Sequence, residues 1–315
     1  MATSKITIEQ YIGFEKKKET KAKVKVPVGK IVSFVILAAF CFIWVLPFII
    51  MFTGSLRGYI DNQLYPDELF YPHSGYTLEN YNILLKGEYP DGLIHNDSQD
   101  YTIGRWFLNS CFSAIGGTAL YLFVASLAAY AFTFIPFKYS NVLFTVLVFS
   151  MVIPGAATSV GNQMIVFGTG LNESLLALII PGLGGIYGMY LIKTFFSGIP
   201  KDLIESAKMD GYSNFKIYLK IVLPLGKTVL LVQGLFGFMG GWNDLIWPQM
   251  LYGVKDTDMW TLQVGMAYVI NNSKSVSLIG TALAGGVICL APVFVMYLFA
   301  QRYIIEGMAS AGIKG

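Results

Sequence analysis

Long apolar runs alternate with polar segments along this chain of 315 residues. A helix that crosses a membrane needs about 20 consecutive apolar residues, and several of these runs reach that length. The pattern therefore predicts an all-α polytopic membrane protein with six transmembrane helices. The predicted spans are residues 31–53 and then about 106–135, 141–160, 175–195, 228–250 and 278–300.

Charges between the spans predict the orientation of the chain. The loop at 54–104 is acidic, with Arg57 and Lys86 as its basic residues, whereas the loop at 196–227 carries five lysines. Lysine-rich loops stay in the cytoplasm. We therefore expect the loops at 54–104, 161–174 and 251–277 to face outward, and the loop at 196–227 and both termini to be cytoplasmic.

The domain organisation follows from these spans. Residues 1–30 are lysine-rich and form a basic cytoplasmic tail, although a basic amphipathic helix on the membrane surface is an alternative. Residues 31–302 form the transmembrane domain, and residues 303–315 form a cytoplasmic tail. The first apolar run is too long for the core of a signal peptide and lacks a small-residue cleavage site, so we expect it to remain as a helix.

Composition agrees with a membrane protein. Hydrophobic residues make up 55% of the chain and charged residues 13%, whereas soluble domains carry about 25% charged residues. The net charge of +3 is too small to indicate nucleic-acid binding. Cys41, Cys111 and Cys289 lie in apolar runs, which favours packing over disulfides. His73 and His95 share one polar loop and have no partner at metal-ligand spacing, so no metal site is expected.

Residues 200–225 form a polar, charged stretch between two apolar runs. Pro200 suits the first turn of a helix, and Asp202 and Glu205 lie near that end, where the helix dipole favours carboxylates. Gly211 then interrupts the helical pattern directly after Asp210. We predict a helix, a glycine turn and a second helix that leads into the membrane. An ordinary amphipathic connector is the alternative.

The spacing of Glu205, Asp210-Gly211 and Leu223-Pro224 resembles the cytoplasmic EAA loop of bacterial ABC-importer permeases. Ser206 stands where the first alanine of that motif would be. The resemblance implies that this loop couples the membrane helices to an ATPase. Glu205 would pair with a basic group, Asp210 would cap or brace the turn, and Gly211 would set the angle between the helices. The residues implied in ATPase coupling are Glu205, Ser206, Ala207, Asp210, Gly211 and Pro224.

Further stretches resemble the permeases of maltose-type carbohydrate importers, from about residue 31 to the end of the chain. The resemblance places a contact with the ATPases in the C-terminal tail at Ile313, Lys314 and Gly315. The segments that carry the resemblance are Tyr76–Tyr81, Arg105–Ser110, Ala128–Phe132, Trp242–Pro248 and Gln301–Gly307.

This family implies a type I ABC importer permease fold in a bacterial cytoplasmic membrane. Its members work with a second homologous permease, a homodimeric or heterodimeric ATPase, and a sugar-binding lipoprotein or periplasmic protein outside. ATP and Mg²⁺ would bind the ATPase subunits, and no cofactor is expected in this chain. Oligosaccharides would cross by alternating access, in which closure of the ATPases moves the membrane helices.

Candidate substrate-pathway residues lie in the fifth predicted span. Trp242, Asn243, Asp244 and Trp247 offer aromatic faces and polar groups, and Trp242 would lie roughly 21 Å above the inner end of that helix. An ionisable group at membrane depth normally faces the protein interior or a water cavity. Trp247 could instead belong to the aromatic belt, and Asn243 and Asp244 to a helix–helix hydrogen bond. Asn162, Gln163 and Gln233 are weaker candidates.

Packing and outer-loop roles are also predicted. Gly184 with Gly188, and Gly237 with Gly241, have the spacing of close helix packing, within the chain or at a partner permease. The resemblance implies binding-protein contacts in the loop at 251–277. Those contacts would be Tyr252, Asp256, Asp258 and Trp260. A separate prediction concerns the helix after the glycine turn, whose side chains Phe215, Tyr218, Leu219 and Val222 are expected to pack beneath the bundle.

No catalytic motif is evident in the sequence. Gly226-Lys227-Thr228 ends like a P-loop, but position 221 is Ile and the segment opens a membrane helix. The alternatives are a related permease for another solute, such as a sugar phosphate or an aminated sugar, and a secondary transporter or channel acting alone. The latter predicts paired half-repeats and buried charges on several helices, and neither is evident.

Overall fold

The fold is described from a computed structural model. It covers residues 28–65, 67–68, 70–86, 103–253, 256–272 and 279–312, with side chains described as far as Gln301 apart from that of Asn272. The predicted basic tail up to residue 27, residues 87–102 and the C-terminal contact Ile313–Gly315 lie outside the described residues. The chain divides into two compact units, Met1–Phe48 and Ile49–Gly315. The regular secondary structure of the described residues is helical, with one isolated β-bridge between Arg57 and Tyr76.

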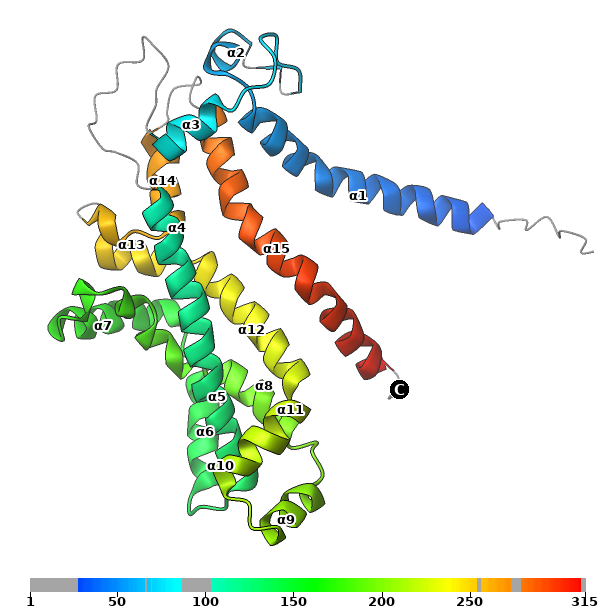
Figure 1. Cartoon of the computed structure of the whole chain (residues 1–315), viewed down its shortest axis with the longest axis vertical. Coiled ribbons are helices and arrows are strands. Elements are labelled where there is room, and N and C mark those ends of the chain that lie inside the picture. The colour runs from blue at the N-terminus through cyan, green and yellow to red at the C-terminus, as the bar shows by residue number, and fades with distance from the viewer. Residues whose placement is uncertain are drawn as a thin grey trace, which may run out of the picture. The chain divides into compact units, whose positions relative to one another are not determined.

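Two long helical stretches of the second unit match predicted spans. The first joins α4 (Ile103–Cys111), the π-helix η2 (Phe112–Gly116) and α5 (Gly117–Phe134) into 32 residues of helix. The second is α15 (Ile279–Gly312), of which Ile279–Gln301 is apolar enough to cross a membrane. Both pack against α12 (Lys227–Trp242), as Figure 1 shows.

Two other predicted spans are bent instead of continuous. α6 (Ser140–Ser150) and α7 (Gly155–Gly168) meet at 102°. The 3₁₀ segments at 175–184 meet α8 (Ile186–Phe196) at 48°. Pro154 precedes α7 and Pro181 lies in the second 3₁₀ segment. Because proline lacks a backbone N–H, each interrupts the helical ladder at a point that a hydropathy pattern does not show.

The third bend, of 80°, separates the segment Asn214–Leu225 from α12. Gly226 lies at this bend, where an added Cβ would overlap the Phe196 ring. The predicted span at 228–250 also ends early, because α12 stops at Trp242 and α13 (Ile246–Tyr252) begins anew. The Asp244 carboxylate accepts a hydrogen bond from the Trp247 N–H (3.3 Å) at this second start.

The segments predicted as outer loops contain short helices. They are α2 (Tyr59–Leu64), α3 (Glu79–Lys86) and α14 (Leu262–Asn272). Asn80 of α3 bonds to two other segments. Its Nδ2 donates to the carbonyls of Ser55 and Arg57, and its Oδ1 accepts from Thr281 of the last span. α3 and α14 both pack on α15.

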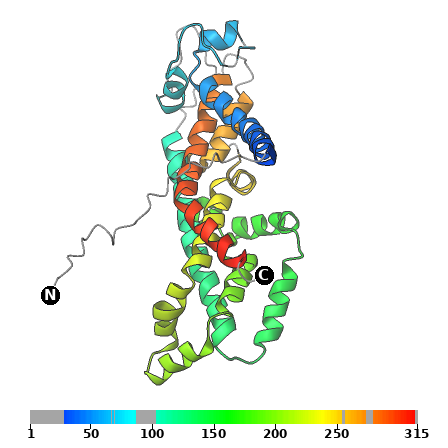
Figure 2. The same ribbon diagram turned by 90° about the vertical axis from the view of Figure 1, so that its right-hand side faces the viewer.

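Two clusters of buried side chains organise the second unit. The Trp106 cluster includes Trp106, Trp242 and Trp260, and joins α4, α12, α13, α14 and α15. The Tyr218 cluster joins α5 and α8 to the polar segment that follows α8. Figures 1 and 2 place that segment at the end of the unit opposite α3 and α14.

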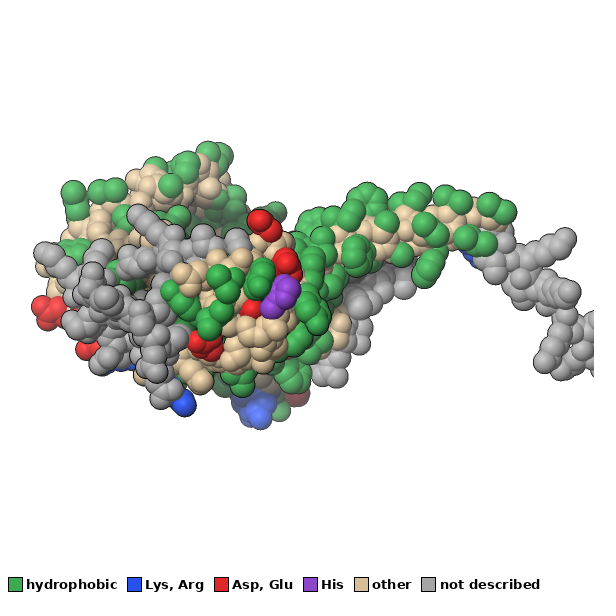
Figure 3. All heavy atoms as spheres, turned by 90° about the horizontal axis from the view of Figure 1, so that it is seen from above, with side chains coloured by type: hydrophobic (Ala, Val, Ile, Leu, Met, Phe, Trp, Pro, Cys, Tyr) green, Lys and Arg blue, Asp and Glu red, His purple; other side chains and the backbone are tan. Residues whose placement is uncertain are grey.

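α1 (Val28–Ser55) is described by itself because the two units meet within it. Its 28 residues are long and apolar enough to cross a membrane. Hydrophobic side chains cover its outer surface (Figure 3), among them Phe34 and Trp44, which are 71% and 74% exposed. A surface of this kind is costly in water and suits lipid, because exposed apolar area is stable in a bilayer.

Candidate functional site: the polar coupling segment and the cavity

The polar segment begins with α9 (Lys201–Met209) and turns at Gly211. The N–H of Gly211 donates to the Lys208 carbonyl and the N–H of Tyr212 donates to the Ala207 carbonyl, both at 3.0 Å. This pair of bonds is a Schellman motif, which requires a left-handed residue after the helix cap. Gly211 has φ of 77°, as the sequence predicted, and a Cβ there would meet no neighbour within 4 Å. Backbone conformation alone therefore selects glycine at this position.

α9 has one anchored face and one free face. Ile204 and Ala207 are buried in the Tyr218 cluster, at 3% and 5% exposure. Glu205 and Ser206 are exposed, and Met209 is 88% exposed. Ala207 thus supports the helix from inside, whereas Glu205 and Ser206 are available to a partner. Pro224 is also exposed, in α11 (Leu223–Leu225) beside the bend at Gly226.

Asp210 is the C-cap residue of α9, as predicted, and it acts there through its backbone N–H. The Asp210 side chain is exposed and makes no hydrogen bond within the part of the chain that the structure describes, because the Schellman bonds come from the backbone. Ser213 caps the next helix, α10 (Asn214–Ile217), with its Oγ accepting from the Lys216 N–H (3.3 Å). A serine three residues before the paired N–H is the usual N-cap signal.

A π-helix, η6 (Tyr218–Val222), follows α10 and changes which side chains face inward. Tyr218 and Val222 are buried as predicted, together with Ile217. Phe215 and Leu219 were predicted to pack beneath the bundle, but they are 55% and 43% exposed. Leu219 lies within the π-turn, which alters the α-helical spacing of inward side chains, whereas Phe215 precedes that turn in α10.

The Tyr218 side chain connects the polar segment to α5. Its hydroxyl lies 2.8 Å from the Ser126 hydroxyl, and its ring centroid lies 5.4 Å from that of Tyr130. On the other side, Phe196 of α8 fits against Gly226. Packed aromatic rings therefore connect the polar segment to α5 and α8.

At the opposite end, α4 clamps the segment before α14. The Trp106 Nε1 donates to the Thr257 carbonyl (2.9 Å) and the Asn109 Nδ2 donates to the carbonyls of Asp258 and Trp260. The Ser110 Oγ accepts from the Leu262 N–H (2.8 Å). These contacts give a structural reason for the Arg105–Ser110 sequence.

The four predicted binding-protein contacts divide into two groups. Tyr252 and Trp260 are 4% and 1% exposed, and they donate to the carbonyls of Ser174 and Gly253. Burial, and secondly the charge of Asp256, raise the pKa of Tyr252 to about 12, which keeps its phenol a donor. Asp256 is exposed and Asp258 pairs with Arg105 at 3.0 Å on the surface. Direct contact with a binding protein stays a prediction for these two carboxylates.

The four predicted pathway residues are not brought together. Trp242 is 1% exposed and its Nε1 donates to the Cys289 carbonyl, while the Trp247 Nε1 donates to the Ala177 carbonyl, both at 3.0 Å. Both indoles thus fix helices to one another. Asn243 is exposed and donates to the Met239 carbonyl of its own helix. Of the four, Asp244 lines the cavity described next.

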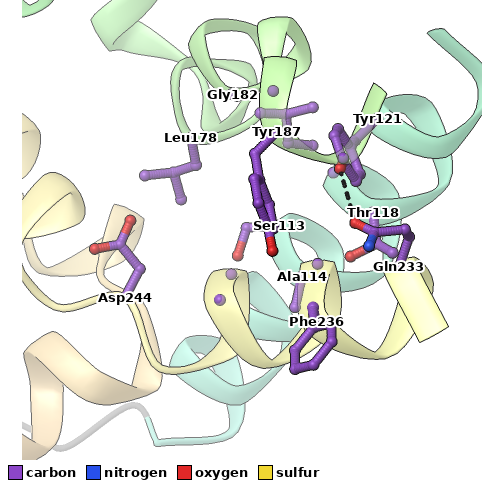
Figure 4. A pocket seen from close by; sticks show the side chains of 17 residues that line it. Ser113, Ala114, Thr118, Tyr121, Leu178, Gly182, Tyr187, Gln233, Phe236 and Asp244 are labelled. Atoms are coloured by element: carbon purple, nitrogen blue, oxygen red, sulfur yellow. Dashed lines mark hydrogen bonds between the residues drawn. The ribbon is translucent and has the colours of Figure 1, made fainter. Parts of the chain in front are cut away.

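A cavity of about 380 Å³ lies between η2, α5, the 3₁₀ segments, α8 and α12 (Figure 4). Its polar side chains are those of Ser113, Thr118, Tyr121, Tyr187, Gln233 and Asp244. Gln233, a weaker candidate in the sequence, is 4% exposed, and its Oε1 accepts from the Tyr121 hydroxyl at 3.3 Å. The sequence did not single out Tyr121, because nothing in its spacing pairs it with Gln233 on a distant helix.

The glycine pairs serve packing within this chain. Added Cβ atoms at Gly237 and Gly241 would lie 3.2 Å from Thr118 and Ala114, and one at Gly188 would overlap the Tyr121 hydroxyl. Gly184 has no neighbour within 4 Å of such an atom in the described structure. Three of the four glycines therefore allow close helix approach, as predicted, and do so without a partner chain.

Comparison with known proteins identifies the class. Residues 28–308 match the family described as the inner membrane component of binding-protein-dependent transport systems. The match covers most of the chain, so the protein belongs to this family and is a permease component of an ABC importer. It is accordingly a multi-pass protein of a bacterial cytoplasmic membrane.

Individual relatives refine this placement. The chain is similar to the maltodextrin transport system permease protein MalD of Streptococcus pneumoniae, with 32% identity over 67% of this chain and 75% of the relative. It is also similar to the galactooligosaccharides transport system permease protein GanQ of Bacillus subtilis, with 28% identity over 93% and 98% of the two chains.

One solved structure supports the fold. A chain of a bacterial ABC transporter involved in the import of the acidic polysaccharide alginate superposes with a TM-score of 0.72. The sequence identity is 20%, and the superposition covers 88% of this chain and 96% of the other. The fold is therefore that of an ABC importer permease.

Proposed function

We propose that this permease imports oligosaccharides together with a second homologous permease, an ATPase dimer and an extracellular binding protein. The ATPase is homodimeric or heterodimeric, and the binding protein is a lipoprotein or a periplasmic protein. Two relatives with oligosaccharide substrates in their names support the substrate class. ATP and Mg²⁺ bind the ATPases, and this chain couples their closure to alternating access.

In the proposed topology the chain crosses the membrane six times. Three single helices and three bent pairs have the length and composition for six spans. The lysines of the segment 196–227 favour a cytoplasmic position for α9, with both termini on the same side. The contact of Ile313, Lys314 and Gly315 with an ATPase, which the family resemblance implies, requires this cytoplasmic C-terminus.

The observation that carries the proposal is the geometry of α9. Its buried side chains anchor it to the Tyr218 cluster, while Glu205 is exposed on the opposite face. A short helix held in this way moves as a rigid body. We propose that Glu205 pairs with a basic residue of the ATPase and that the Tyr218–Ser126 contact passes the motion to α5.

Mild solubilisation of the native membrane followed by identification of co-purifying chains tests this function. We expect one second permease and an ATPase, with the ATPase lost on Glu205→Ala or Gly211→Pro. Glu173→Ala is a matched control, because Glu173 is an exposed acid in a different segment, the 3₁₀ helix Leu171–Glu173. Recovery of the chain alone, or as a homodimer that still moves solute, contradicts the proposal and favours a secondary transporter.

A further inference from the structure

The cavity between α5, α8 and α12 contains polar groups with unused hydrogen-bonding capacity. Gln233 is 4% exposed, and its Oε1 accepts from Tyr121, but its Nε2 has no acceptor among the described residues. The Thr118 Oγ is buried and has no partner in the described structure either. Buried polar groups are nearly always paired in folded proteins, and small-molecule sites place a few polar groups on the cavity wall, so this stretch of wall is suited to a polar ligand.

Neighbouring glycines hold these groups in place. Added Cβ atoms at Gly185 and Gly188 would overlap the ring and the hydroxyl of Tyr121, so α8 leaves a cradle for this side chain. The Gly188 position would also bring a Cβ within 2.8 Å of the Gln233 Oε1. The Tyr121–Gln233 pair is therefore fixed by the packing of three helices and is built into the fold.

Aromatic side chains complete the wall. Tyr187 and Phe236 line the cavity (Figure 4) and are 61% and 62% exposed. Small-molecule sites commonly combine apolar and aromatic walls with a few placed polar groups, in volumes of about 300–1,000 Å³. Hydroxyl-rich molecules with apolar C–H faces match this combination.

Asp244 sets the preferred charge of the ligand. Its carboxylate lines the same cavity, and its Oδ1 is engaged by the Trp247 N–H. A carboxylate repels a nearby anion more strongly in a membrane interior than in water, because the effective dielectric constant is lower. A neutral ligand is therefore favoured over a phosphorylated or uronic one.

We infer that Thr118, Tyr121 and Gln233 form a hydroxyl-binding subsite for an uncharged sugar, with Asp244 selecting against anionic sugars. The subsite rests on the proposed importer function and assigns substrate contact to this chain. The Gln233 Nε2 donates to a sugar oxygen, the Tyr121 phenol orients the Gln233 amide, and Thr118 lies beside them in the wall.

The test uses the complete transporter in proteoliposomes with its binding protein. Radiolabelled maltotriose, arabinotriose and galactotriose are first compared for uptake, and the fastest becomes the probe. Gln233→Met keeps the length of the side chain and removes its donors. We expect the maximal uptake rate to fall about five-fold, the effect of one lost hydrogen bond. The concentration for half-maximal uptake stays unchanged, because the binding protein sets it.

Two measurements separate binding from packing. Mono-deoxy analogues of the probe are compared in wild type and in Gln233→Met. In wild type, one analogue should be taken up more slowly than the probe by the same factor that Gln233→Met costs. In the variant, that analogue and the probe should be taken up at the same rate. Tyr190→Phe is the matched control for Tyr121→Phe, since Tyr190 stacks on Phe144 and does not line the cavity. Only Tyr121→Phe should lower uptake.

Asp244→Asn tests charge selection, because asparagine retains an acceptor for the Trp247 N–H. The ratio of uronic trisaccharide uptake to probe uptake should be at least about five-fold higher in the variant than in wild type. The binding protein is the same in both transporters, so its own preference cancels in this comparison. If Gln233→Met takes up the probe with the same kinetics as wild type, the subsite is overturned. If Asp244→Asn leaves the uronic-to-probe uptake ratio unchanged, charge selection is overturned. If wild type imports no neutral trisaccharide, the proposed function and the subsite both fail.

Discussion

The hydroxyl oxygens of Ser126 and Tyr218 lie 2.8 Å apart, although the two residues are 92 positions apart in the sequence. Both side chains are buried, at 2% and 1% exposure. Tyr218 follows the exposed helix α9 by way of α10, and Ser126 lies in α5, a wall of the cavity. The contact therefore links the coupling segment to the helix that carries Thr118 and Tyr121.

We expect this contact to contribute measurably to stability. Tyr218→Phe and Ser126→Ala should each lower the free energy of unfolding, and the coupling energy of the double-mutant cycle should be about 1 kcal/mol. Thermal unfolding of the purified permease in lipid nanodiscs measures all four variants. Strictly additive effects of the two substitutions would show that the hydroxyls do not interact.

Gly211 should tolerate asparagine better than alanine. With φ of 77°, an alanine at this position costs about 1–2 kcal/mol, whereas asparagine adopts left-handed conformations more readily. ATPase co-purification should decline from wild type through Gly211→Asn to Gly211→Ala. Gly161→Ala is the control, because Gly161 lies in α7 without positive φ and with no neighbour within 4 Å of an added Cβ. Equal effects at both positions would contradict the role of the turn.

The outer clamp should be sensitive at Gly265. An added Cβ there overlaps the Trp106 indole, which itself donates to the Thr257 carbonyl. Gly265→Ala should therefore separate α14 from α4 and lower stability by roughly 1–3 kcal/mol through overpacking. Limited proteolysis of the segment 256–262 reports the separation. Gly104→Ala, whose Cβ would meet no neighbour within 4 Å, should change neither measurement.

Sequence reasoning succeeded where local chemistry determines structure. The Asp210-Gly211 step predicted a helix end with a left-handed glycine, and the Schellman bonds confirm it. Apolar runs of about 20 residues predicted α1, the 103–134 helix and α15. Each of these features depends on residues close together in the chain.

Other features depend on non-local packing or on small changes in helical geometry. Leu219 lies within the π-turn Tyr218–Val222 and is exposed, and this change of helical geometry leaves no trace in the hydropathy pattern. The pairing of Tyr121 with Gln233 requires α5 and α12 to meet, which no spacing in the sequence encodes. Trp242 looked suited to a sugar, but its indole N–H is used by the Cys289 carbonyl of α15.

The proposed ion pair of Glu205 is tested most directly by the ratio of ATPase to permease after purification. Glu205→Gln removes the charge and keeps the size and helix propensity of the side chain. We predict at least about a ten-fold loss of bound ATPase, because one charge of a desolvated pair is left without its partner. The second permease should still co-purify in full. A wild-type ratio in Glu205→Gln would contradict the role of Glu205 in coupling.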